Sequence, residues 1–305
     1  MKNLSKSKYT TYCQCPKGLW LRIYKPEEQI IDPSVQARFE AGSEVGELAK
    51  RLFGEFEDVT TYVPMDDGSQ CLDLKAMIAK TQDCLNRNVE NIAEAAFSYD
   101  GCYCAVDILH KTENGYAIYE VKSSTDLSHL EVYAQDVAYQ KYVLTNCGIN
   151  VTGTYLVNIN NEYVLDGELN VKEFFNISDI SEAVADEYLK VPTRIAQAKQ
   201  MLEGGEPERD FGEYCHKPYG CTFWEYCSRD IIPHPSVFDL YRMSFKKALE
   251  HMNEGRLTLE NMREEKLTDT QQLQLECTLG DKTYINKDGI KEFLTQLSYP
   301  LYFLD

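Results

Sequence analysis

Apolar residues recur at helical spacing in four stretches of the chain, and elsewhere they run together as in β-strands. The helical pattern covers residues 34–52, 72–85, 129–147 and 180–202, and Gly54 and Gly148 supply stop signals after two of these stretches. Residues 94–122 have the pattern of strands, and a further strand is predicted at 151–159. Helices and strands that interleave in this way predict an α/β fold.

The character of the chain changes after about residue 230. The run IIPHPSVFDL is a connector interrupted by prolines, and two or three short, charged helices are predicted after it. The sequence ends on SYPLYFLD, an apolar run that is predicted to form a strand. We therefore expect one domain over residues 1–230 and a helical connector over residues 231–305 that leads to a truncated or missing second domain.

Asn114-Gly115 is a strong signal for a tight turn between two strands of the β region. A loop with an even number of residues leaves two registers open, with Asp107 opposite either Glu120 or Lys122. Because side chains alternate along a strand, both registers put Asp107, Glu120 and Lys122 on one face of the sheet.

Two carboxylates beside an ammonium group form a candidate site. Carboxylate oxygens suit Mg²⁺ or Mn²⁺. Such an ion can lower the pKa of a bound water and stabilise charge on a phosphoryl oxygen. Lys122 would then orient or activate that water. The alternative interpretation is a solvated strand face with a cross-strand salt bridge, which is common in antiparallel sheets.

The predicted helix at 129–147 follows the second strand and can cover this face. It carries Gln135, Asp136, Tyr139 and Gln140. A glutamine can hydrogen-bond a phosphate or a metal-bound water without adding charge. The alternative interpretation is an ordinary exposed helix face.

The composition of the chain bears on which partners it can bind and on whether its compartment is reducing. The chain has 305 residues, of which 31 are Lys or Arg and 49 are Asp or Glu, so its net charge is −18. No global positive field attracts nucleic acid or an anionic membrane, although a local groove with bound cations can still act on nucleic acid. The N-terminus has no apolar core of signal-peptide length, and no stretch reaches the roughly 20 apolar residues of a membrane helix. We expect a cytoplasmic protein without a membrane partner, whose 11 cysteines are thiols or metal ligands rather than disulfides.

Asp107, the run Glu120-Val121-Lys122 and a following helix with Gln140 together resemble the PD-(D/E)XK nuclease core in its RecB-like form. The resemblance implies a restriction-endonuclease-like mixed central sheet flanked by helices, within residues 1–230, with a C-terminal helical extension. It implies that Asp107 and Glu120 hold Mg²⁺ or Mn²⁺. It also implies that Lys122 positions the attacking water and that Gln140 orients this water or the scissile phosphate. Gln135, which begins a Gln-x-x-x-Tyr run, is the alternative to Gln140.

The predicted helix at 34–52 occupies the place of the family's first motif. Many relatives, including the CRISPR-associated exonucleases, have a histidine four residues after a glycine. Here that position, counted from Gly42, is Gly46. Glu47 is therefore the candidate metal ligand of the first motif, with Glu44 as the second choice. Glu94, at the head of the first strand, is expected to support the site.

Cysteines gather near the two ends of the expected domain. The run YCHKPYGCTFWEYCS contains three of them, and YCQCP near the N-terminus contains two. Four thiolates bind either Zn²⁺ or an iron–sulfur cluster, and wide spacing without a C-x₂-C pair favours a [4Fe–4S] cluster. A Cys-Pro near the N-terminus with three cysteines after the core resembles the iron–sulfur staple of the CRISPR-associated and AddB-type nucleases. That resemblance implies a [4Fe–4S] cluster, or Zn²⁺ as the alternative, on Cys15, Cys215, Cys221 and Cys227. Cys13 lies outside this set.

The last residues have a resemblance of their own. In uncharacterised bacterial proteins with this layout, a Tyr/Phe-Leu-Asp-Phe-Glu run opens a second domain similar to DEDD exonucleases, and SYPLYFLD is similar to its start. Together the resemblances imply an Mg²⁺- or Mn²⁺-dependent deoxyribonuclease, stabilised by the cluster, that acts on single-stranded DNA or on DNA ends. The alternative, favoured by Gly46 and by the net charge, is a non-catalytic nucleic-acid-binding or scaffold module that keeps the fold and the cluster.

Overall fold

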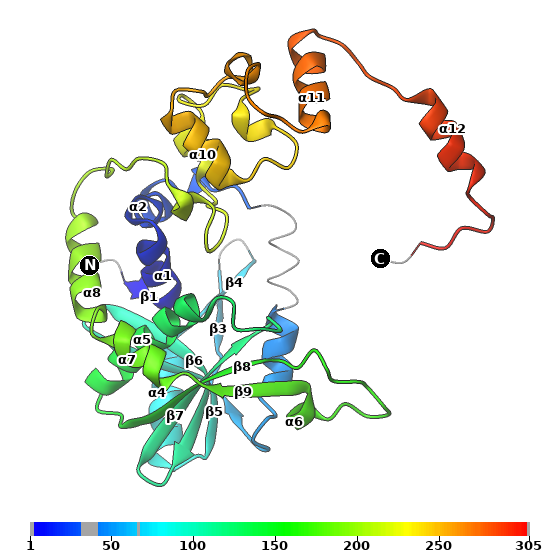
Figure 1. Cartoon of the computed structure of the whole chain (residues 1–305). Coiled ribbons are helices and arrows are strands. Elements are labelled where there is room, and N and C mark those ends of the chain that lie inside the picture. The colour runs from blue at the N-terminus through cyan, green and yellow to red at the C-terminus, as the bar shows by residue number, and fades with distance from the viewer. Residues whose placement is uncertain (1–2, 32–41, 66–67, 304–305) are drawn as a thin grey trace. The chain divides into compact units, whose positions relative to one another are not determined.

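A computed structural model describes residues 3–31, 42–65 and 68–303 of the chain, and a seven-stranded mixed sheet organises residues 1–210 (Figure 1). The sheet has the order β2-β5-β6-β7-β8-β9, and β1 pairs with β6 beside this path. Its strands are β1 (Leu4–Ser5), β2 (Glu57–Asp58), β5 (Asn91–Tyr99), β6 (Cys102–Thr112), β7 (Gly115–Lys122), β8 (Val151–Ile159) and β9 (Phe175–Asp179). A separate antiparallel pair consists of β3 (Tyr62–Pro64) and β4 (Gln70–Leu72).

Both strand directions occur within the sheet. The pairs β5–β6, β6–β7 and β8–β9 are antiparallel. The pairs β1–β6, β2–β5 and β7–β8 are parallel. The predicted α/β class with a mixed central sheet flanked by helices is confirmed.

Helices cover both faces of this sheet. The helices of residues 1–228 that the structure describes are α1 (Lys6–Gln14), α2 (Pro16–Tyr24), residues 42–49, α4 (Leu74–Asn86), α5 (Leu130–Asn146), α6 (Val171–Phe174), α7 (Ser181–Tyr188), α8 (Val191–Met201) and α9 (Trp224–Ser228), with 3₁₀ turns η1 (Pro26–Glu28) and η2 (Glu213–Cys215). Ile118 packs in one cluster with Val137 of α5, whereas its neighbour Tyr119 packs in another with Val45 and Ala49. Since adjacent side chains of a strand point to opposite faces, α5 and the helix at 42–49 lie on opposite sides of the sheet.

The chain divides into two compact units, Met1–Asp210 with Tyr214–Tyr226, and Phe211–Glu213 with Cys227–Asp305. The expected boundary at residue 230 lies close to this division. The second unit has a small core of its own, built from η3 (Val237–Asp239), α10 (Phe245–Asn253), η4 (Leu259–Met262) and α11 (Asp269–Leu279). α12 (Lys287–Thr295) follows. Nowhere in the described ranges is a helix both long and apolar enough to cross a lipid bilayer.

Three predicted elements differ from those observed. The expected long helix at 180–202 is two helices, because Pro192 has no N–H to donate to Tyr188, the last residue of α7. The helix expected at 34–52 is described only from residue 42 and is helical to residue 49, while residues 34–41 lie outside the described part. The final apolar run is not a strand over residues 298–303, where no neighbouring strand pairs with its backbone.

The hairpin turn is also displaced by one residue from its predicted place. Thr112 pairs with Gly115, so Gly115 is the first residue of β7 rather than part of the loop. A Cβ at this position would lie 2.1 Å from the carbonyl oxygen of Asn150. Glycine is required here by the close approach of another backbone.

Candidate active site

Backbone pairing along the β6–β7 hairpin fixes which residues face one another. Ile108 pairs with Tyr119, and continuing this register by one residue sets Asp107 opposite Glu120. The first of the two predicted registers is therefore confirmed. Lys122, two residues beyond Glu120, lies on the same face.

Asp107 is held by the backbone of the neighbouring strand. Its Oδ2 accepts a 2.7 Å hydrogen bond from the N–H of Val121. Its Oδ1 lies 3.9 Å from the Nζ of Lys6, and 24% of the side chain is exposed. One carboxylate oxygen is thus engaged by β7, while part of the group remains open to solvent.

Glu120 is the centre of the site. Its side chain is 1% exposed, and three other side chains donate hydrogen bonds to it. Oε1 accepts from Lys6 at 2.9 Å and from Lys122 at 2.8 Å. Oε2 accepts from Gln140 at 2.6 Å and from Lys6 at 3.1 Å. A buried carboxylate requires such partners, and the alternative of a solvated strand face is wrong for Glu120.

Helix α5 covers this face of the hairpin. Asp136 and Gln140 are four residues apart and so lie on one side of the helix. Asp136 accepts a 2.8 Å hydrogen bond from Lys122, and the side chain of Gln140 is completely buried. The interpretation of an ordinary exposed helix face is therefore wrong here. Gln135 is only half-buried, so Gln140 is the glutamine that the fold brings to Glu120.

One polar atom of Gln140 has no partner among the described residues. Its Nε2 donates to Glu120, while its buried Oε1 lacks a hydrogen-bond donor. An unsatisfied buried acceptor is costly. This atom is suited to accept a hydrogen bond from a water or from a metal-bound water beside Glu120.

The charges in the site shift the pKa values of the two carboxyl groups in opposite directions. Burial opposes ionisation of Glu120, but the ammonium groups of Lys122 and Lys6 outweigh it and lower its pKa to about 2. Burial and the charge of Glu120 raise the pKa of Asp107 to about 6, against the opposing effect of the two lysines. Despite burial, the carboxylates around Lys122 raise its pKa well above the usual value. Glu120 is thus a fixed anion, and Asp107 is the group whose charge a bound cation would stabilise.

Glu94 extends this arrangement to a third strand. Ala93 pairs with Ile108 and Ala95 with Val106, which sets Glu94 in line with Asp107. The backbone of Glu94 has φ 56°, a value that residues with a side chain rarely adopt. Burial and the charge of Asp107 raise the pKa of Glu94 to about 7. Glu94, Asp107 and Glu120 therefore form a row of acids across β5, β6 and β7.

Lys6 is a member of the site that no sequence pattern indicated. It is the first residue of α1, directly after the two-residue strand β1. Leu4 of β1 pairs with Cys102 of β6, and this pairing brings the start of α1 to the hairpin. A strand of two residues has no recognisable pattern, and its partner lies almost one hundred positions away in the chain.

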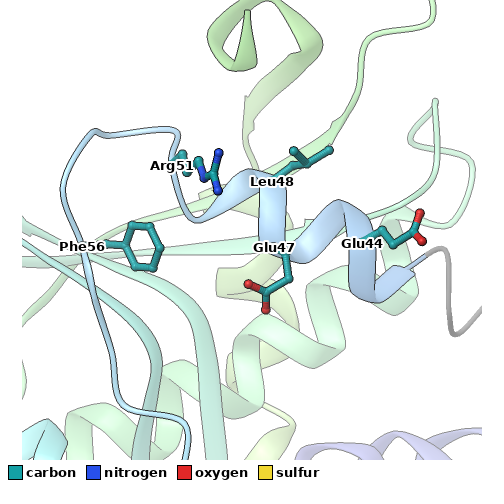
Figure 2. A pocket seen from close by; sticks show the side chains of 5 residues that line it. All are labelled: Glu44, Glu47, Leu48, Arg51 and Phe56. Atoms are coloured by element: carbon teal, nitrogen blue, oxygen red, sulfur yellow. The ribbon is translucent and has the colours of Figure 1, made fainter. Parts of the chain in front are cut away.

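The first-motif candidates Glu44 and Glu47 line a pocket on the helix at 42–49 (Figure 2). The side chain of Glu47 is 70% exposed and forms an ion pair with Lys50. Within the described ranges, no hydrogen bond or ion pair joins Glu47 to Asp107 or Glu120. Its role as a metal ligand stays a prediction.

The donor set is one that a hard divalent cation prefers. Asp107 and Glu120 supply carboxylate oxygens from adjacent strands, and the unpartnered Oε1 of Gln140 belongs to the amide that contacts Glu120. In this arrangement the Lys6 ammonium lies against Glu120. Across the part of the chain that is described, no three His, Cys, Asp or Glu side chains are gathered so as to hold a metal ion.

The N-terminal cysteines lie where α1 meets α2. Cys15 separates the two helices, and its Sγ accepts a 3.4 Å hydrogen bond from the N–H of Gly18 as the N-cap of α2. Cys13 lies inside α1 and is partly buried. In the loop after α8, the N–H of Cys221 donates to the carbonyl of Cys215 at 2.9 Å.

This loop contacts the N-terminal helices. The amide of Gln14 donates to the carbonyls of Tyr214 and Tyr219, each at 2.8 Å. Burial raises the pKa of Tyr214 against the opposing effect of Arg209, and the thiols of Cys215 and Cys15 add to the rise. Three of the four predicted cluster ligands thus belong to segments of the first unit that touch, whereas Cys227 belongs to the second unit.

No protein-family model matches the chain, and a search of curated proteins finds no similar sequence.

Proposed function

We propose that this chain is a metal-dependent nuclease of the RecB-like PD-(D/E)XK class, with a restriction-endonuclease-like sheet, that hydrolyses phosphodiester bonds in single-stranded DNA or at DNA ends. The observation that carries the proposal is the surroundings of Glu120. This buried carboxylate lies in line with Asp107 and accepts hydrogen bonds from Lys122 and Gln140. These four residues are the ones that the resemblance selects from the sequence.

Each side chain has a role that its position supports. Asp107 and Glu120 would hold Mg²⁺ or Mn²⁺, which when bound supplies positive charge to the phosphate and lowers the pKa of water. Lys122, fixed between Glu120 and Asp136, would hold the attacking water. Gln140 would orient this water through its unpartnered Oε1. Attack of the water forms a new P–O bond and breaks the P–O bond to the leaving oxygen, and the proton that the water loses balances the one that the leaving oxygen takes up.

The proposal includes a [4Fe–4S] cluster on Cys15, Cys215, Cys221 and Cys227, with Zn²⁺ as the alternative metal. Support comes from the contacts of Gln14 with the loop that carries Cys215 and Cys221. Metal binding by the folded chain alone would offset the entropy lost in closing so long a loop.

A second candidate function is a non-catalytic nucleic-acid-binding or scaffold module. Lys6 favours it, because its ammonium already neutralises the carboxylate that would hold the metal. The net charge of −18 favours the scaffold form of this candidate, because it provides no positive field that attracts nucleic acid. Both functions predict the same fold, so only an activity measurement separates them.

The test is a cleavage assay with Mn²⁺ on end-labelled single-stranded DNA, blunt duplex DNA, closed circular DNA and single-stranded RNA. The informative variant is Asp107→Asn, because an amide oxygen can still accept the hydrogen bond from Val121 while the charge is lost. Cleavage should fall about a hundredfold or more in this variant. The exposed Asp166→Asn serves as the matched control and should cleave like the wild type.

Two results would contradict the proposal. Equal cleavage by Asp107→Asn and the wild type would assign any activity to another site or to a contaminant. Wild-type protein that binds labelled DNA but cleaves none of the four substrates would favour the non-catalytic module.

A further inference from the structure

The ammonium of Lys6 lies on the oxygens that the proposed metal site would use. Its Nζ is 2.9 Å and 3.1 Å from the two oxygens of Glu120 and 3.9 Å from Oδ1 of Asp107. A divalent cation bound by these carboxylates would need to lie about 2.0–2.6 Å from the same oxygens. An ammonium and a metal ion cannot both occupy that space.

The backbone of Lys6 is anchored by packing and pairing, whereas its ammonium is held by the two carboxylates of the site. Leu4 is buried and pairs with β6, and the hydroxyl of Tyr139 donates a hydrogen bond to the Leu4 carbonyl. Tyr9, on the next turn of α1, stacks on Tyr139 with ring centroids 4.7 Å apart. The Lys6 side chain is 24% exposed, and four methylene groups with rotatable bonds separate its ammonium from this anchored backbone. The ammonium can therefore leave Glu120 without movement of α1.

The two lysines of the site differ in what else holds them. Lys122 also donates a 2.8 Å hydrogen bond to Asp136 and lies 5.3 Å from the ring centroid of Tyr133. The contacts described for the Lys6 ammonium are with Glu120 and Asp107. An incoming divalent cation would thus displace Lys6 in preference to Lys122.

We infer that Lys6 sets the metal affinity of this site: its ammonium occupies the Asp107–Glu120 pair in the metal-free protein, and a divalent cation binds by displacing it. The inference rests on the proposed function for the identity of the metal ligands. A cation that binds carboxylates weakly would fail to displace Lys6, so the lysine also selects among cations.

The test is titration of the whole chain with Mn²⁺, with free Mn²⁺ measured by its electron paramagnetic resonance signal. Lys6→Met removes the competing charge and keeps an unbranched side chain. Its Mn²⁺ affinity is expected to rise about tenfold. Lys8→Met removes the same charge from the same helix and is expected to stay within about twofold of the wild type, because Lys8 donates instead to the Asn3 carbonyl. Circular dichroism checks that both variants are folded.

A second measurement needs no variant. Amine acetylation of the wild type, read by peptide mass spectrometry, should modify Lys6 faster when Mn²⁺ is present, while the rate at Lys8 should not change. Unchanged labelling of Lys6 at saturating Mn²⁺ would overturn the inference.

Asp107→Asn distinguishes failure of this inference from failure of the proposed function. If Asp107→Asn loses Mn²⁺ binding but Lys6→Met binds like the wild type, the metal site stands and the competition by Lys6 is wrong. If Asp107→Asn binds Mn²⁺ as the wild type does, the metal lies elsewhere, and both the inference and the proposed ligands are refuted.

Discussion

The side-chain amide of Gln140 donates a 2.6 Å hydrogen bond to Glu120 and so joins α5 to β7 inside the candidate site. Both side chains are buried. Two lysines already neutralise Glu120, and the amide adds a donor without adding a third cation. The hydrogen bond therefore supports the charge of Glu120 and fixes the direction in which Oε1 of Gln140 points.

Gln140→Leu should lower the free energy of unfolding, because the buried carboxylate of Glu120 loses a hydrogen-bond donor. The expected loss is about 2 kcal/mol, the usual size for a hydrogen bond to a charged group. Chemical denaturation measures it, and Gln135→Leu on the same helix should change stability by less than about 0.5 kcal/mol. Equal effects of the two substitutions would show that the contact with Glu120 contributes nothing specific.

Glu94 should make the metal-free protein less stable as the pH rises. Its pKa is raised from 4.5 to about 7 in the folded chain, because it is buried beside Asp107. A raised folded pKa means that the acid ionises more readily in the unfolded chain, so the cost to stability is absent below about pH 4.5, grows up to about pH 7 and is complete above it.

Glu94→Gln should therefore be more stable than the wild type at pH 8, by about 2–3 kcal/mol, and closer to it at pH 5. Thermal melts in EDTA at the two pH values measure the difference. Glu90→Gln, at an exposed position just before β5, is the control and should show no such gain. A gain of the same size at both pH values would mean that ionisation of Glu94 is not the cause.

The placement of Asp107, Glu120 and Lys122 on one face could be predicted because a short turn connects their strands. Side chains alternate between the two faces of a hairpin, and this alternation is kept over the few residues that separate the turn from the site. Gln140 could be predicted because it lies on the next helix along the chain. Lys6 could not, since β1 meets β6 through a contact between distant parts of the chain.

The alignment of Glu94 with Asp107 also had a signal in the sequence. Asp100 and Gly101 form a two-residue turn with φ of 46° and 72°, the conformation that Asp-Gly favours in hairpins. A register counted from this turn sets Glu94 opposite Asp107. The positive φ of Glu94 itself could not be anticipated, because a residue with a side chain rarely adopts it inside a strand.

The ion pairs of Glu206 should stabilise the attachment of α2. Burial opposes ionisation of Glu206, but Lys25, Lys17 and the hydroxyl of Tyr226 outweigh it and hold its pKa at about 2. Its carboxylate lies 3.0 Å from the ammonium groups of both lysines. An acid with a lowered folded pKa stabilises the fold above its ordinary pKa of 4.5, and this stabilisation is lost as the pH falls towards 2.

Glu206→Gln should lower stability at pH 7 by about 1 kcal/mol, a size that allows for the partial exposure of the group. The difference from the wild type should shrink below about pH 4.5. Thermal midpoints across the pH range measure it, with the exposed Glu208→Gln as the control. A difference that is the same at pH 3 and pH 7 would contradict the ionic origin of the effect.

The last prediction concerns the cysteines. Cys15 and the loop with Cys215 and Cys221 belong to segments that Gln14 joins by two hydrogen bonds. If these thiolates and Cys227 hold a [4Fe–4S] cluster, anaerobically purified protein should be brown and absorb broadly near 400 nm.

Cys221→Ser should bleach this colour and lower the thermal midpoint, because the cluster binds only the folded chain and thereby stabilises it. Cys71→Ser, at an exposed cysteine, should change neither property, and Cys13→Ser should keep the colour. Elemental analysis for iron and zinc then identifies the bound metal. A colourless protein with stoichiometric zinc would show that these cysteines hold a zinc ion instead of the cluster. A protein with neither metal, whose stability does not change in Cys221→Ser, would refute a metal site on these cysteines.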